Sequence, residues 1–333
     1  MLGDKQHGRW LLSPASQVAS TGRRYREGSM VLETDFVTEE GTVRVVDCMP
    51  IRGKEPDIIR RVEGLSGRVP MHMDLTIRFD YGSIVPWVRN VEGRLLAIGG
   101  PDALCLQTPV QTRGADLSTV ADFTIEEGQR VPFVLSWFPS HEPLPEPLEP
   151  DKAINDTDSW WREWSSTCNY QGRWRDQVLR SLLILKTLTY APTGGIIAAP
   201  TTSLPECIEG IRNWDYRYCW LRDSTFTLYA LMSAGYKHEA CAWRDWLLRA
   251  VAGDPARLQI MYGVAGERRL PELEIDWLPG YERSAPVRIG NAAVNQHQLD
   301  VYGELMDTLH LARRIGIEPH EPAWALQRHW LEV

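Results

Sequence analysis

Eleven consecutive residues combine aromatic rings with fixed charges in a pattern that suits recognition of a polar ring. Residues 213–223 read Asn-Trp-Asp-Tyr-Arg-Tyr-Cys-Trp-Leu-Arg-Asp. The apolar C–H face of a sugar packs on an indole ring, and its hydroxyl groups form paired hydrogen bonds with guanidinium and carboxylate groups. This pattern predicts a carbohydrate pocket. A helix start that is rich in aromatic residues and held by ion pairs would have the same composition, and spacing alone does not separate the two.

The last residues of this stretch stand at the start of a predicted helix. We expect the carboxylate of Asp223 to stay ionised beside Arg222 and to accept two hydroxyl groups, while Arg222 donates to another. An aspartate in the first turn also interacts favourably with the helix dipole. A binding role and a purely structural role therefore both fit Asp223.

A second group of carboxylates lies on a predicted loop between residues 271 and 291. The loop carries Glu272, Glu274, Asp276 and Glu282 close to two aromatic residues. Hydrolysis of a glycosidic bond usually requires two carboxyl groups, one protonated and one ionised. These four residues are the first nominees for such a pair. Solvated charges that pair with neighbouring arginines are the simpler alternative.

The sequence motifs of nucleotide-binding proteins, metal sites and serine hydrolases are missing. Gly194 and Gly195 are not followed by the Lys-Ser/Thr of a phosphate-binding loop, which argues against nucleotide binding. His297 and His310 are thirteen residues apart on one predicted helix and lie on different faces, which argues against a metal site. No Gly-x-Ser-x-Gly motif of a serine hydrolase is present. We therefore predict no cofactor and no metal.

Composition narrows the class of partner and compartment. The chain has 333 residues, a net charge of −8 and no basic run, which argues against nucleic acid or an anionic membrane surface as partner. Its six cysteines are scattered without a Cys-x-x-Cys pair, so free thiols and a cytoplasmic location are expected. No apolar run reaches membrane-spanning length.

The first 140 residues have the pattern of a β-sheet domain. Over residues 69–81 an apolar residue occupies every second position, which places one face of a strand on a core. Many short strands separated by turn residues are typical of an antiparallel sandwich. The further strands are predicted at 30–37, 42–49, 57–63, 94–99, 103–108, 120–125 and 131–138.

The rest of the chain has the pattern of a helical domain. Five prolines between residues 139 and 151 predict a stiff linker, after which Asp156 or Asp158 is expected to cap a helix. Helices joined by long loops fit a helical toroid or bundle. These helices are predicted at about 173–191, 222–235, 237–252, 291–316 and from 321 onward.

Seven segments together resemble the prokaryotic branch of glycoside hydrolase family 15, which comprises glucoamylase, glucodextranase and trehalase-like enzymes. The resemblance extends over nearly the whole chain, and the motifs are specific as a set. The segments are 7–10, 45–50, 78–82, 194–206, 213–223, 276–281 and 286–291.

This resemblance implies a multidomain, all-β plus all-α fold. Residues 1–140 would form an N-terminal antiparallel β-sandwich, 141–172 a proline-rich linker with a linker helix, and 173–333 part of an (α/α)6 helical barrel. It also implies an inverting attack of water on an α-linked glucosyl residue, giving release of glucose from an α-glucan oligosaccharide or trehalose. Which α-glucoside is cleaved, and the oligomeric state, stay open.

The resemblance also assigns binding residues. Trp220, Arg222 and Asp223 match the tryptophan and the Arg-Asp pair that line the glucose subsite, Arg288 lies in a loop that borders the same pocket, and Asn291 is carried over from that loop. The general acid of the family follows the helix that 321–333 begins, and the general base lies further on. Neither has a matching position, so both are expected beyond Val333. The loop carboxylates are withdrawn as the catalytic pair.

These assignments predict a fragment that holds the sandwich and the glucose-subsite half of the barrel and is inactive alone. The alternative is a non-catalytic carbohydrate-binding or assembly protein derived from such an enzyme. Because each helix of a toroid packs against neighbours on both sides, a partial ring is also expected to expose apolar helix faces.

Overall fold

The computed structural model describes residues 1–252, 257–318 and 320–332. The chain forms two compact units, one from Gly3 to Trp164 and one that contains Met1–Leu2 and the residues from Ser165 onward. Val333, the last residue of the expected barrel domain, lies outside the described residues. The three-part division at residues 140 and 172 stays a prediction.

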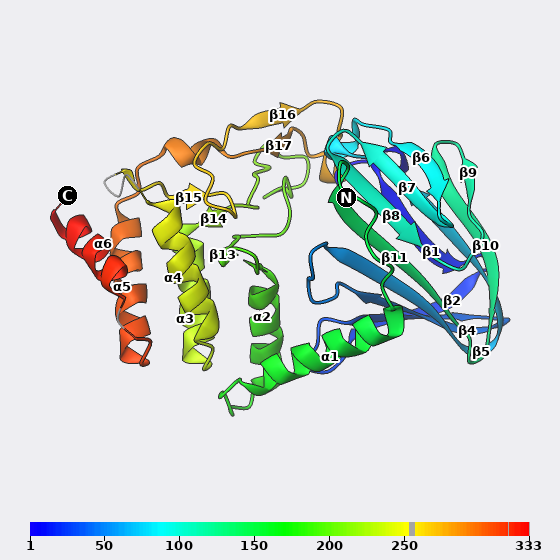
Figure 1. The fold of residues 1–333 in the computed structure, drawn as a ribbon, viewed down its shortest axis with the longest axis horizontal. Helices are drawn as coiled ribbons and strands as arrows, with labels where there is room; N and C mark the ends of the chain where they lie inside the picture. The colour runs from blue at the N-terminus through cyan, green and yellow to red at the C-terminus, as the bar shows by residue number, and fades with distance from the viewer. Residues whose placement is uncertain (253–256, 319, 333) are drawn as a thin grey trace. The chain divides into compact units, whose positions relative to one another are not determined.

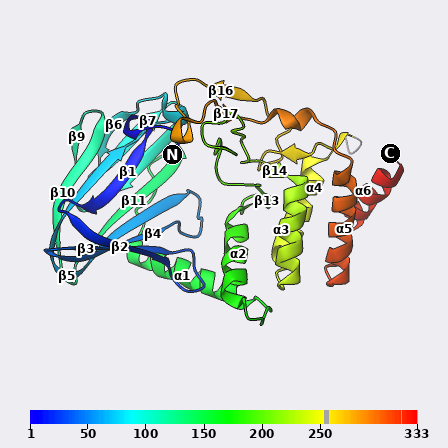
Figure 2. The ribbon, with the colours of Figure 1, turned by 180° about the vertical axis from the view of Figure 1, so that it is seen from behind.

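The first unit is built from antiparallel strands that form two facing sheets (Figures 1 and 2). The larger sheet has the order β2-β3-β4-β5-β11-β8-β7-β6, and β1, β10 and β9 extend the pairing from the other end of β5. The strands are β1 (Arg9–Pro14), β2 (Val18–Tyr25), β3 (Leu32–Thr38), β4 (Gly41–Cys48), β5 (Asp57–Thr76), β6 (Trp87–Val91), β7 (Arg94–Gly99), β8 (Asp102–Gln107), β9 (Arg113–Ala115), β10 (Ser118–Glu126) and β11 (Arg130–Pro139).

Strand β5 belongs to both sheets. Its first half pairs with β4 and β11, and its second half pairs with β1 and β10. The change occurs near Gly64 and Gly67, where a Cβ on Gly64 would lie 2.0 Å from the carbonyl oxygen of Glu126. The prediction of two strands, 57–63 and 69–81, is therefore wrong in its boundaries. Glycine here lets one strand pass from sheet to sheet instead of ending it.

The predicted alternation in the second half of β5 is confirmed. Val69, Met71, Met73 and Leu75 are all at most 3% exposed and belong to the core between the sheets. The strand ends at Thr76, however, before the 3-10 helix η2 (Asp80–Gly82), although Ile77 (7% exposed) and Phe79 (9% exposed) still belong to the same core. Residues 77–81 are consequently not part of the strand.

Helix α1 (Pro150–Ser166) lies on the outer face of the larger sheet (Figure 1). Its Ile154 is fully buried against Val46, Ile59 and Val134, which point away from the core between the sheets. The helix begins at Pro150 and not at Asp156 or Asp158, since proline is well accepted in the first turn of a helix. This part of the sheet is therefore covered on both faces.

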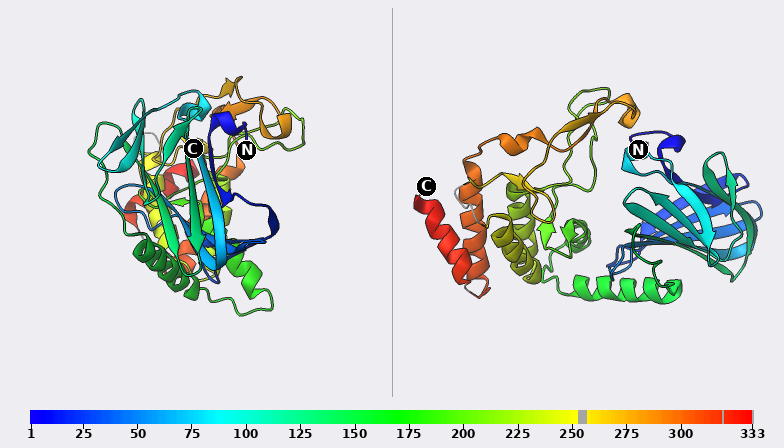
Figure 3. Two further views of the ribbon diagram at one scale, coloured as in Figure 1. Left: turned by 90° about the vertical axis from the view of Figure 1, so that its right-hand side faces the viewer. Right: turned by 45° about the horizontal axis from the view of Figure 1, so that its top comes forward.

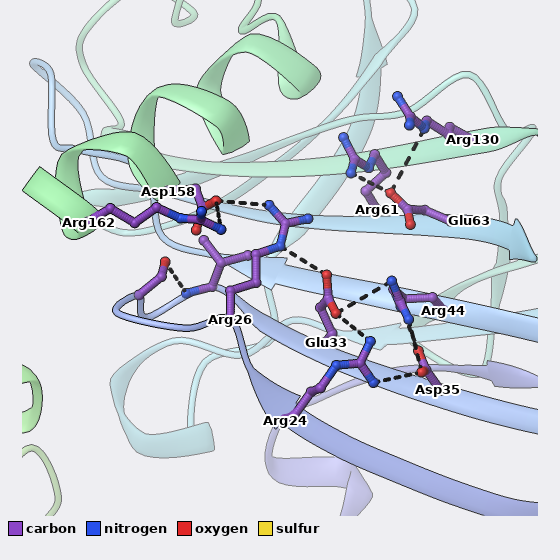
Figure 4. Close-up of polar contacts among 12 residues, drawn as sticks. Arg24, Arg26, Glu33, Asp35, Arg44, Arg61, Glu63, Arg130, Asp158 and Arg162 are labelled. Carbon is purple, nitrogen blue, oxygen red and sulfur yellow. Dashed lines mark hydrogen bonds and ion pairs between the residues drawn. The ribbon is translucent and has the colours of Figure 1, made fainter. Parts of the chain in front are cut away.

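Ion pairs surround this contact (Figure 4). The carboxylate of Glu33, with a side chain 9% exposed, accepts from Arg24 at 2.7 Å and from Arg26 at 2.9 Å. Arg26 continues to Asp158 of α1 at 3.6 Å. Nearby, the buried guanidinium of Arg61 binds Glu63 and also Asp151 of α1. The network thus joins the sheet to the helix.

The second unit is helical. Apolar residues of several of its helices form one core around Trp243 and Trp246. Helix α4 lies beside α3, and α6 lies beside α5, as Figure 1 and the right-hand view of Figure 3 show. The helices are α2 (Arg175–Thr187), α3 (Leu221–Ser233), α4 (His238–Ala250), α5 (Asp300–Arg314) and α6 (Glu321–Glu332).

The predicted helix 291–316 is wrong in its first part. Residues Ala292–Asn295 form the 3-10 helix η5, and α5 begins only at Asp300. The side chain of Asn291 accepts a hydrogen bond from the backbone N–H of Ala293, which caps this short turn. Residues 291–299, which the periodicity assigned to a helix, therefore belong to the loop that precedes α5.

Short antiparallel pairs fasten the long loops at the ends of the helices. The pair of β14 (Cys219–Trp220) and β15 (Met261–Tyr262) leads directly into α3. The other pairs are β12 (Thr189–Tyr190) with β13 (Gly195–Ile196), and β16 (Leu273–Ile275) with β17 (Val287–Ile289). Among the described residues, no helix is both long and apolar enough to cross a membrane.

Candidate functional site

A cavity of about 490 Å³ lies among the loops of the helical unit. It is bordered by three aromatic side chains, one cation and one carboxylate, with small residues of η5 completing the wall. The lining residues are Trp214, Tyr216, Trp220, Arg222, Glu272, Asn291, Ala292, Ala293 and Gln296. Three of the five predicted binding residues, Trp220, Arg222 and Asn291, are in this set.

The aromatic wall comes from the chain that leads into α3. Asp215 forms an isolated antiparallel bridge with Thr202, so the backbone is locally extended there. Side chains of extended chain alternate between two sides, and Trp214 and Tyr216 accordingly both line the cavity. The rings of Tyr216 and Trp220 lie 6.1 Å apart. Sequence reasoning placed Trp214 and Tyr216 in a sugar-binding stretch but did not nominate them individually.

Arg222 and Asp223 stand in the first turn of α3. The guanidinium of Arg222 lies 5.9 Å from the ring centre of Trp220 and 3.6 Å from the carboxylate of Asp223. Asp223 does not line the cavity, and its Oδ2 atom is buried without a hydrogen-bond partner in the described part of the chain. Burial raises the pKa of Asp223 and outweighs the opposing effect of Arg222.

Glu304 of α5 adds a carboxylate that sequence reasoning missed. Burial is the largest cause that raises the pKa of Glu304, and the neighbouring charges of Asp300 and Asp223 act in the same direction. Arg222 opposes this change, so Glu304 belongs to the surroundings of the Arg222–Asp223 pair. Its position on a distant helix left no local signal.

Arg288 lies behind the cavity wall and does not line it. Its guanidinium is 4.8 Å from the ring centre of Trp214 and 3.4 Å from the carboxylate of Glu272, two residues that do line the cavity. It also donates to the carbonyl of Ile211 and to Glu274. With a side chain 12% exposed, Arg288 can orient lining residues more directly than it can meet a ligand.

Asn291 lines the cavity, yet its amide also has partners inside the protein. Its Nδ2 donates to the backbone carbonyl of Asp215 at 3.1 Å, and its Oδ1 accepts from the N–H of Ala293 at 3.0 Å. The amide of Asn291 therefore links the segment at Asp215 to the turn at Ala293, and both segments border the cavity.

Glu272 is the only carboxylate among the described lining residues. One of its oxygens accepts from the backbone N–H of Ala292 at 3.0 Å, and the other faces Arg288. The other three loop nominees, Glu274, Asp276 and Glu282, do not line the cavity. No group of three or more His, Cys, Asp or Glu residues within 1–252, 257–318 and 320–332 is arranged to hold a metal ion.

Both units match models of known protein families. Residues 172–332 match the model of Glycosyl hydrolases family 15, and residues 1–135 match the model described as Trehalase-like, N-terminal.

Curated relatives match almost the whole chain. The trehalase of Mycolicibacterium smegmatis is 35% identical over 99% of this chain and 54% of its own length. The trehalase of Mycobacterium tuberculosis is 35% identical over 99% of this chain and 53% of its own length. The trehalase of Thermoplasma acidophilum is 32% identical over 88% of this chain and 51% of its own length. The chain thus spans about half the length of these relatives.

Among solved structures, a bacterial glucoamylase complexed with acarbose aligns with a TM-score of 0.56 at 13% identity, covering 98% of this chain and 61% of that chain. At this identity the likeness concerns the fold alone. It confirms the predicted fold class, an antiparallel β-sandwich followed by part of an (α/α)6 helical barrel.

Proposed function

We propose, from the match of residues 172–332 to Glycosyl hydrolases family 15, that the cavity holds a terminal glucosyl unit of an α-linked glucoside. The observation that carries the proposal is the convergence of Trp214, Tyr216 and Trp220 with Arg222 on one space of about 490 Å³. Aromatic faces pack on the apolar side of a pyranose, and Arg222 and Glu272 provide a donor and an acceptor for its hydroxyl groups. Asp223 and Asn291 are proposed to complete the set.

The reaction of the whole protein is proposed to be hydrolysis with inversion. A general acid protonates the leaving oxygen while a general base activates water on the opposite face of the sugar. Glu272 is a single carboxylate with both oxygens engaged by the protein, so it does not constitute such a pair. We place the acid and the base beyond Val333 and assign recognition of the glucosyl unit to the residues described above.

Trehalose is the proposed substrate, ahead of maltooligosaccharides and isomaltose. Support comes from relatives named trehalase that are 35% identical over 99% of this chain. The glucoamylase likeness, at 13% identity, does not bear on the choice of substrate.

Glucose release from trehalose, maltose and isomaltose tests the proposal. The 333-residue chain is compared with a version extended by whatever coding sequence follows Val333 in its gene. We expect the extended version alone to release glucose, and fastest from trehalose. Cleavage by the 333-residue chain itself would contradict our placement of the acid and base and would return Glu272 to consideration.

Binding without cleavage is the second candidate function. It is favoured by the absence of a carboxylate pair among the described lining residues of the cavity. A stop codon directly after Val333, together with calorimetric binding of trehalose and no glucose release, would support this candidate over the hydrolase.

A further inference from the structure

A buried ion pair lies directly behind the aromatic wall of the cavity. Asp215 is 0% exposed and sits between Trp214 and Tyr216, which both line the cavity. Because side chains alternate along extended chain, Asp215 points away from the cavity, to the same side as Arg217. The sequence Trp-Asp-Tyr-Arg thus presents two rings on one side and an ion pair on the other.

The carboxylate of Asp215 is bound at both oxygens. Oδ1 accepts from Nε of Arg217 at 2.9 Å and from the N–H of the same residue at 3.1 Å. Oδ2 accepts from Nη2 of Arg217 at 2.7 Å and from the N–H of Gly290 at 3.1 Å. A two-point arginine–carboxylate contact of this kind fixes direction as well as distance.

The bond to Gly290 joins two segments that are far apart in the sequence. The carbonyl of Asp215 also accepts from Nδ2 of Asn291, so the residue holds the 290–291 backbone at two points. Gly290 has a φ of +77° and a Cβ there would lie 1.8 Å from the carbonyl oxygen of Pro271, so only glycine fits this close approach of two backbone segments. Asn291, Ala292 and Ala293 follow at once in the cavity wall.

We propose that Asp215 is a positioning residue that locks the aromatic segment 214–216 and the segment 290–293 into one rigid wall. The inference rests on the proposed sugar-binding function. Asp215 touches no ligand itself. Its removal leaves the lining side chains present but allows the two segments to move independently, so affinity for the sugar falls because the wall is no longer pre-arranged.

The test compares Asp215→Asn with the native chain and with Asp245→Asn. The asparagine keeps the shape of the side chain and one acceptor oxygen but loses the charge. Asp245 provides a matched control, because it pairs with Arg244 at 3.3 Å while 50% exposed on α4. Trehalose binding is measured by calorimetry, thermal unfolding by circular dichroism, and amide exchange over 287–293 by mass spectrometry.

We expect Asp215→Asn to raise the Kd for trehalose about tenfold or more, the scale of one lost hydrogen bond to a charged group. Exchange over 287–293 is expected to become faster and Tm to fall, because a buried ion pair loses one partner, whereas Asp245→Asn should match the native chain. Arg217→Lys, which keeps the charge but not the two-point contact, should act in the same direction more weakly. It replaces Asp215→Asn if that variant does not fold.

The outcomes separate this inference from the proposed function. If Asp215→Asn binds trehalose as tightly as the native chain does, the positioning role is overturned and the proposed function stands. A native chain that binds neither trehalose, maltose nor isomaltose would overturn the proposed function. Unchanged exchange over 287–293 in Asp215→Asn would contradict the positioning role whether or not sugar binds.

Discussion

Asp223 is the residue in which the needs of binding and of folding conflict most directly. One of its oxygens is buried without a hydrogen-bond partner in the described part of the chain, and the charge of Arg222 is 3.6 Å away. Burial raises its pKa, which means that the folded state favours the protonated form more than the unfolded state does. Asp223 therefore stabilises the fold below its unfolded pKa, and this contribution is lost as the pH rises through its folded pKa.

Replacing Asp223 with Asn tests this conflict. At pH 7 the variant should unfold at a Tm higher by about 1–3 °C, because a partly buried charge has been removed from a side chain that is still 43% exposed to solvent. Trehalose affinity should fall, because Arg222, which lines the cavity, loses the charge 3.6 Å away that holds it in place. Thermal scans at pH 7 and at pH 3.5, with calorimetry at pH 7, measure both effects.

The two pH values supply the control. At pH 3.5, below the ordinary pKa of an aspartate, most of the native carboxyl is protonated and resembles an amide in charge, so the difference in Tm should shrink. A native protein that is more stable than Asp223→Asn at pH 7 would show that Arg222 outweighs burial, contrary to the direction argued here.

Local patterns revealed some residues of the site and hid others. Arg222 could be found because aromatic and charged residues stand together within eleven positions, whereas Trp220 is assigned by the family resemblance, and the structure places both on the cavity. Asp215 lay in the same stretch, but its importance depends on Gly290, 75 residues away. Glu304 is still further along the chain. No periodicity in one sequence reports contacts at such separations.

At the scale of elements, charge fastens helix α1 to the sandwich. Glu33 on β3 lies among Arg24, Arg26 and Arg44, and Arg26 reaches Asp158 on the helix (Figure 4). The guanidinium of Arg44 is also the largest cause that lowers the pKa of Asp35. Asp35 therefore contributes stability above its unfolded pKa, and that contribution is lost as the pH falls through its folded pKa.

Glu33→Gln should destabilise the sandwich by about 2–4 kcal/mol, because three arginines then share fewer carboxylates in a largely buried place. Urea unfolding followed by near-ultraviolet circular dichroism measures the change. Asp122→Asn is the matched control, since Asp122 pairs with Arg113 at 3.1 Å while 58% exposed, and it should change stability by less than about 1 kcal/mol. Equal effects of the two variants would contradict the importance given to burial.

Element boundaries were predicted well where pattern and turn chemistry agreed. The strand predicted at 94–99 is β7, and the helix predicted at 222–235 is α3 with ends shifted by one or two residues. Errors arose where tertiary contacts decide. Gly64 separates the strands predicted at 57–63 and 69–81 but lies within β5, and residues 291–299 belong to a predicted helix but contribute η5 to the cavity wall. In both places a contact with a segment far away in the sequence sets the backbone, namely Gly64 with Glu126 and Asn291 with Asp215.

At the scale of the whole molecule, the helical unit exposes large apolar side chains. Phe226 is 65% exposed and Tyr229 is 56% exposed, and their spacing of three residues places them on one face of α3. Ile184 on α2 is 41% exposed. Because Phe226 is 65% and Tyr229 56% exposed, covering both would contribute roughly 5–7 kcal/mol, at roughly 25 cal/mol per Å² and about 150–250 Å² for each whole side chain. This face is therefore a driving force for association.

We expect the 333-residue chain to self-associate and to bind a dye specific for exposed apolar surface. The double variant Phe226→Gln/Tyr229→Gln should reduce both effects, because it removes neighbouring rings from one face. By contrast, Met49→Gln, which removes a side chain 67% exposed on the sandwich unit, should change neither. Sedimentation velocity at several concentrations and dye fluorescence provide the measurements. A native chain that sediments as a monomer at every concentration, with dye fluorescence no higher than the double variant, would mean that this face of α3 does not drive association. Phe226 and Tyr229 would then be ordinary surface residues that need no partner to cover them.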